Sequence, residues 1–239
     1  MGKLVGERRA LAAAVLGFYM SIYFLVSLSA PGGWGAAFGG LAGVYAVAFV
    51  GLVAGYFWAR WFAIGVGISG LVSGALSIWQ IGPEPLLVFY GATHAVAALA
   101  LWGGRMAEAF DGRSDWRDRF HMDENATHRL GKSVIRVGVS LPYIVLYALA
   151  PRDGAGTAIA ALALAAAGAY GLARLRTWGV FALAGAAVTA AASAAGALPA
   201  TASGVGLDVA GLGLAAGILL AAAAAPFAGP MVRYLRARG

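Results

Sequence analysis

The sequence predicts an all-α integral membrane protein with eight transmembrane helices, arranged as two parallel four-helix repeats. Three observations support this fold class. Long apolar stretches fill the chain, almost every Lys and Arg falls on one side of them, and parts of the first half resemble parts of the second.

The apolar stretches identify a membrane protein. Mean hydropathy is +0.80 and 11% of the residues are charged, against about 25% in soluble domains. A helix needs about 20 apolar residues to cross roughly 30 Å of hydrocarbon. The stretches are continuous rather than alternating, which excludes a transmembrane β-barrel. The predicted spans are 10–30, 37–59, 61–81, 86–103, 133–150, 156–173, 177–198 and 208–229.

The positive charges predict the orientation. Of the 17 Lys and Arg residues, all except Arg152 lie on the same side of the predicted spans. Cytoplasmic loops carry the excess of Lys and Arg, so both termini are expected in the cytoplasm. The Ala- and Gly-rich composition is typical of a bacterium, which makes the inner membrane the expected location. Because these cations are dispersed at helix ends, they favour contact with anionic membrane lipids over nucleic-acid binding.

Three pairs of short segments suggest a duplication. Residues 23–31 resemble 143–151, residues 56–60 resemble 170–174, and residues 104–106 resemble 229–231. Four spans per unit is an even number, so both copies would have the same orientation and be related about the membrane normal. The alternative is chance similarity between apolar segments. The predicted division is a first repeat at 1–103, a cytoplasmic linker at 104–132 and a second repeat at 133–239.

The linker is polar and balanced, with six acidic and six basic residues. Asp115 with Arg119, and Trp116 with Phe120, are spaced four residues apart, which predicts a short amphipathic helix on the membrane surface. We interpret the segment as a solvated linker, and a docking surface for a cytoplasmic partner is the alternative.

Two histidines and two acids within the linker form a candidate metal site: His121, Asp123, Glu124 and His128. Their spacing matches no zinc signature. The simpler interpretation is that Asp123 caps the helix of the fifth span while the histidines pair with nearby acids. Metal binding is therefore not favoured.

Small residues recur at multiples of four in several spans and predict helix-contact faces. They are Gly39, Gly43, Gly51 and Gly55 in the second span, Gly65, Ser69, Ser73 and Ser77 in the third, and Gly213 and Gly217 in the eighth.

His94 is the best candidate for a functional position, because ionisable groups at mid-membrane depth are costly. Its neighbours on one helix face, including Tyr90, indicate that it points into the bundle. There it would bind a ligand, relay a proton, or bond a hydroxyl of the third span or Gln80. The candidate ligand-binding residues are His94, Tyr90, Gln80, Ser73 and Tyr143.

Absent residue types exclude several functions. The chain has no cysteine, and its two lysines lie outside the spans, which excludes thiolate metal sites and a retinal Schiff base. No cofactor is predicted, bound lipid is expected, and the few polar residues argue against an enzyme. The first hypothesis is a non-catalytic subunit or scaffold of a larger membrane assembly, with a membrane protein or a second copy as its partner. The alternative is a carrier or channel for an uncharged or lipidic small molecule, using a cavity between the repeats.

Overall fold

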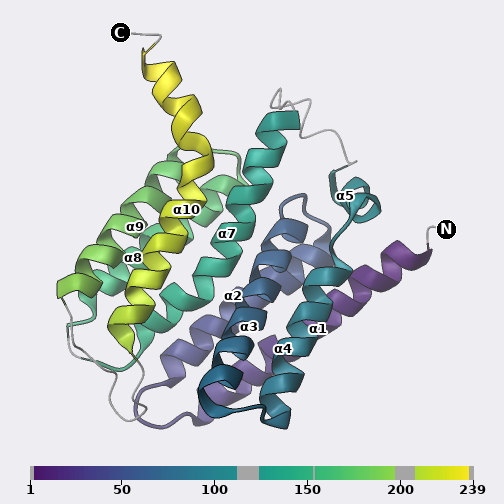
Figure 1. Cartoon of the computed structure of the whole chain (residues 1–239), viewed down its shortest axis with the longest axis vertical. Helices are drawn as coiled ribbons and strands as arrows, with labels where there is room; N and C mark the ends of the chain where they lie inside the picture. The colour runs from purple at the N-terminus through teal and green to yellow at the C-terminus, as the bar shows by residue number, and fades with distance from the viewer. Residues whose placement is uncertain (1–2, 112–123, 153, 197–207, 237–239) are drawn as a thin grey trace.

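A computed structural model describes residues 3–111, 124–152, 154–196 and 208–236, which are almost entirely helical (Figure 1). The helices are α1 (Lys3–Ser29), α2 (Gly35–Ala54), α3 (Ala59–Ile81), α4 (Pro85–Ala100), α5 (Gly104–Asp111), α7 (Glu124–Leu149), α8 (Gly156–Ala173), α9 (Trp178–Gly196) and α10 (Val209–Arg236).

The predicted class, an all-α polytopic membrane protein, is confirmed. Within the described residues, seven helices are long and apolar enough to cross a membrane. An eighth span is present if α4 and α5, which meet at an angle of 71°, are taken together. The predicted span at 86–103 is therefore a short helix of 16 residues followed by a sharp bend.

Several helix ends differ from the predicted spans, because helices do not stop where the apolar residues stop. The first helix begins at Lys3, and α7 begins at Glu124, so both extend well beyond the expected starts at 10 and 133. Conversely, α2 ends at Ala54 because Gly55 takes a left-handed conformation with φ of 73°, which is a common helix stop.

The helices form two four-helix units. In each unit, consecutive helices pack together and the first also packs on the fourth, which gives α1–α4 and α7–α10. Helix α7 then packs on α3 and α2 and joins the units, as Figure 1 shows. A two-fold axis relating the units would pair α9 with α1 as α3 pairs with α7. Helices α1 and α9 are not among the closely packed pairs of described helices.

The turns at the ends of α2 and α8 share a backbone pattern. Tyr56 N bonds Gly51 O as Arg176 N bonds Gly171 O, and Gly55 N bonds Leu52 O as Leu175 N bonds Leu172 O. Each residue of the second turn lies 120 positions after its counterpart, the same separation as between Tyr23 and Tyr143. A constant offset supports duplication, which remains a prediction.

Two of the three expected segment pairs are wrong in register. Residues 56–58 precede α3 in the turn, whereas 170–173 are the last turn of α8. Likewise, 104–106 begin α5, whereas 229–231 lie inside α10. Apolar segments draw on few residue types, so these short matches aligned residues that the backbone places differently.

Two arginines at the start of α1 donate hydrogen bonds to carbonyl groups at the C-terminal ends of two other helices. Arg9 donates from Nε to Leu52 O and from Nη2 to Val53 O, both at 2.8 Å. Arg8 donates to Leu99 O and Trp102 O at the end of α4. The last four carbonyls of a helix have no partner within it. Leu52 O and Leu99 O also accept the N–H groups of Gly55 and Trp102, so the arginines add a second donor there and supply one to Val53 O and Trp102 O.

A proline creates a similar requirement within α10. Pro226 has no N–H, so the carbonyl four residues earlier, Ala222 O, loses its helical partner. Arg136 of α7 donates to that oxygen from Nη1 at 2.6 Å, and Ser133 donates to the neighbouring Ala223 O. Arg136 thereby joins α7 to α10.

Glycines set the closest helix approaches. A Cβ on Gly138 of α7 would lie 2.5 Å from Phe62 O and 3.0 Å from the Cα of Gly65. On the opposite side of α3, Gly74 approaches Gly91 of α4, where a Cβ would lie 2.9 Å from its Cα. The third helix is therefore held between α4 and α7. Of the predicted contact glycines, Gly43 instead faces open space.

The short helix α5 is amphipathic, as Met106 and Phe110 are buried and Arg9 lies over the Phe110 ring at 5.3 Å. The residues expected to form the amphipathic helix, 115–120, lie outside the described residues.

Replacing Gly138 with alanine should destabilise the contact between the two units. The added methyl group would overlap the Phe62 carbonyl, and overpacking of this kind typically costs about 1–3 kcal/mol. Gly185→Ala is the matched control, because its Cβ would make an ordinary 3.7 Å contact with Leu164. Thermal unfolding in mild detergent should show a lower midpoint for Gly138→Ala alone. Equal midpoints would contradict the packing described.

Candidate functional site

His94 is fully buried in the first unit and both of its ring nitrogens have partners. Nε2 lies 2.7 Å from the Tyr45 hydroxyl, and Nδ1 lies 2.7 Å from the carbonyl oxygen of Tyr90. A carbonyl only accepts, so Nδ1 carries a hydrogen. In a neutral ring, Nε2 then accepts from Tyr45. The expectation that His94 points into the bundle is confirmed, but its side-chain partner comes from α2 rather than from the third span.

Tyrosine rings surround this imidazole. The Tyr19 and Tyr90 rings lie 4.3 and 4.2 Å from the His94 ring, between centroids, and the Tyr45 ring meets it edge-on at 5.8 Å. The hydroxyls of Tyr23 and Tyr90 are 3.2 Å apart, and Tyr19 bonds Thr93 at 2.7 Å. We call Tyr19, Tyr23, Tyr45, Tyr90, Thr93 and His94 the polar cluster. It lies between α1, α2 and α4.

Gly70 of α3 provides the space for the imidazole. A Cβ at this position would overlap the Cδ2, Cγ and Nε2 atoms of His94. The predicted faces of α3 did not include Gly70, whose spacing from Gly67 and Gly74 follows the helical period of three to four residues.

The other candidate residues lie elsewhere. The Ser73 and Tyr143 hydroxyls are 3.2 Å apart, and Tyr143 donates to Ser69 O at 3.4 Å, so this pair joins α3 to α7. Gln80 is exposed at the end of α3. The structure thus brings together His94 with Tyr90, and Ser73 with Tyr143, but not the five as one site.

The sequence interpretation missed Tyr19, Tyr23 and Tyr45. Tyr19 and Tyr23 are spaced four residues apart, as are Tyr90 and His94, so each pair lies on one helix face. The matched spacing could have indicated that the polar faces of these two helices pack against each other.

The candidate metal site cannot be assembled from the described residues. His121 and Asp123 lie outside them, so the expected Asp123 cap is also outside. Glu124 begins α7 and His128 is exposed on its second turn. No group of three potential ligands occurs among the residues that the structure describes.

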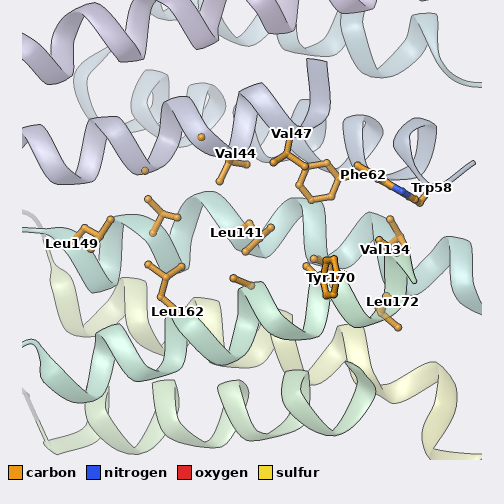
Figure 2. Close-up of a pocket in the computed structure, with 17 residues that line it drawn as sticks. Val44, Val47, Trp58, Phe62, Val134, Leu141, Leu149, Leu162, Tyr170 and Leu172 are labelled. Carbon is orange, nitrogen blue, oxygen red and sulfur yellow. The ribbon is translucent and has the colours of Figure 1, made fainter. Parts of the chain in front are cut away.

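A large apolar groove lies between the two units. Its volume is about 540 Å³, and it is lined by residues of α2 and α3 on one side and of α7 and α8 on the other. Figure 2 shows that the lining side chains follow the length of α7, with Leu149 near one end and Trp58, Tyr170 and Leu172 near the other. None of the five candidate residues lines the groove. The cavity and the polar cluster are separate features.

Removing the Tyr45 hydroxyl should destabilise the first unit. Tyr45→Phe leaves a buried imidazole nitrogen without its partner, and an unsatisfied buried polar group costs about 1–3 kcal/mol. Tyr170→Phe serves as the control, since that side chain is 58% exposed. The measurement is the unfolding midpoint, and an unchanged midpoint for Tyr45→Phe would show that the hydrogen bond contributes nothing to stability.

Comparison of the chain with protein-family models, with curated proteins and with solved structures finds no match. Two features of the described residues are candidates for a functional site. They are a polar cluster in which the imidazole is already paired, and an apolar groove with room for a ligand.

Proposed function

We propose that the protein binds a lipidic molecule in the groove between its two units, as a carrier for that molecule. The supporting observation is the groove itself, at the position where the carrier hypothesis expected a cavity. At about 540 Å³ it falls within the range of small-molecule sites, roughly 300–1,000 Å³. Its lining is aliphatic and aromatic, which matches a hydrocarbon chain.

The length of the groove suits an extended hydrocarbon chain. The lining residues of α7 run from Val134 to Leu149, which spans about 22 Å at 1.5 Å per residue. A chain lying along α7 would contact aliphatic and aromatic side chains from four helices or their ends.

The polar cluster is better explained as structure than as a ligand site. His94 is fully buried and both of its nitrogens are paired within the chain. A ligand would have to displace Tyr45 or a backbone carbonyl, and the exchange would gain little. On this interpretation, the cluster holds α1, α2 and α4 in register and leaves the groove as the binding site.

A scaffold is the second candidate, and α4 is the observation that favours it. This helix packs on α3 and α1 only, among the closely packed pairs, and its other face exposes large apolar side chains. Leu86 and Leu99 are 81% and 67% exposed. In the membrane that face meets lipid, a second copy or a partner subunit.

Narrowing the groove should prevent lipid retention. Ala166 lines it, whereas Ala163 is an exposed residue of the same helix that does not. Ala166→Phe should therefore lose a copurifying lipid that Ala163→Phe retains. Native mass spectrometry after mild extraction measures the bound lipid directly. Equal retention by the two variants would contradict groove binding, and a mass of two chains or of a further subunit would favour the scaffold.

We further propose that the protein lies in a bacterial inner membrane with both termini in the cytoplasm, on the evidence of its Lys and Arg distribution. The chain has no native cysteine, so single cysteines can test the orientation. Gly156 and Gly104 both have open space at their Cβ positions. In intact cells, a membrane-impermeant thiol reagent should label Gly156→Cys and should reach Gly104→Cys only after permeabilisation. The reverse pattern would overturn this orientation.

A further inference from the structure

We propose that the groove takes one chain of a lipid with a phosphate head group, and that Arg174 and Arg176 bind that phosphate. This inference rests on the proposed function and adds the chemistry of the head group. It starts from the groove end that holds Trp58 and Tyr170, because this end lies beside the turn that carries both arginines.

The position of the arginines follows from α8. Tyr170 and Ala173 line the groove, and Arg174 caps the helix immediately after them. The Arg174 guanidinium carbon lies 5.9 Å from the centre of the Tyr170 ring. The Arg174 guanidinium is therefore beside the groove end, and Arg176 follows two residues later in the same turn.

Four other described arginines already have hydrogen-bond partners within the chain. Arg8, Arg9, Arg136 and Arg152 each donate to backbone carbonyls. In contrast, Arg174 and Arg176 are exposed, and neither makes a side-chain hydrogen bond or an ion pair with any residue that the structure describes. The planar guanidinium matches phosphate geometry, so these two have donors available for an anionic head group.

The turn itself is held in place. Leu175 lies between the two arginines with φ of 55°, a conformation usually taken by glycine, as at the counterpart Gly55. Its side chain packs against the buried core, which accounts for a leucine in this conformation. The carbonyls of Gly171 and Leu172 accept backbone N–H groups of the turn, so the negative end of the α8 helix dipole is partly neutralised.

Across the groove end, Trp58 marks the start of α3, whose N-terminus attracts anions.

The test compares phosphatidylglycerol with phosphatidylcholine of identical chains, added to the delipidated full-length protein and followed by native mass spectrometry. Wild type should bind phosphatidylglycerol more tightly, by about fivefold for each arginine. Arg174→Gln/Arg176→Gln should remove this preference and leave phosphatidylcholine binding unchanged. Arg174→Gln alone should reduce this preference, whereas the matched control Arg105→Gln should not, since it removes one exposed cation whose neighbours in the chain do not line the groove.

Each outcome separates the two proposals. Equal affinities of wild type for the two lipids, or an equal loss of preference in Arg174→Gln and Arg105→Gln, would overturn the head-group inference. So would sodium oleate competing as well as phosphatidylglycerol, because the site would then select a carboxylate or the chain alone. Ala166→Phe should weaken both lipids together; if it weakens neither, groove binding itself fails, whatever the arginines do.

Discussion

In a bilayer, every backbone carbonyl must find a donor within the protein, and much of this fold can be understood from that constraint. The ends of α2 and α4 are completed by two arginines from α1, and the carbonyl freed by Pro226 is completed by Arg136. Arg8 and Arg136 thereby join helices that are not consecutive in the chain, α1 with α4 and α7 with α10. The cations from which the membrane orientation is predicted also help to assemble the bundle.

The interior of the first unit contains hydrogen-bonded polar side chains, whereas the groove between the two units is lined by apolar ones. Within the first unit, a buried imidazole, four phenols and a threonine bond or contact one another, which stabilises a specific arrangement of three helices. Between the units, the residues that line the groove are almost wholly apolar. The chain therefore combines a closed polar cluster within one unit with an open apolar groove between the two.

The sequence predicted the class because long apolar runs have few alternatives once backbone pairing is required. It also placed His94 correctly inside the bundle. It did not identify Tyr45 as the partner, because that residue lies 49 positions away and the choice depends on how α2 packs against α4. The groove was expected only as a cavity between repeats, and its lining could not be derived, since valines and alanines face lipid and cavities alike. The register of the predicted repeat was only partly derived for a related reason. Two of the three short apolar matches had other offsets, whereas equivalent backbone bonds at two turns share an offset of 120 residues.

The length of α4 has a consequence for the surrounding bilayer. Sixteen residues span about 24 Å, less than the roughly 30 Å of an average hydrocarbon core. The chain bends by 71° directly afterwards, so α5 adds little length across the bilayer. Among the closely packed pairs of described helices, α4 packs on α1 and α3, and its outer face is exposed. Where lipid covers that face, the bilayer must thin beside α4 to match it, and the protein would favour thinner membranes or thinner regions within one.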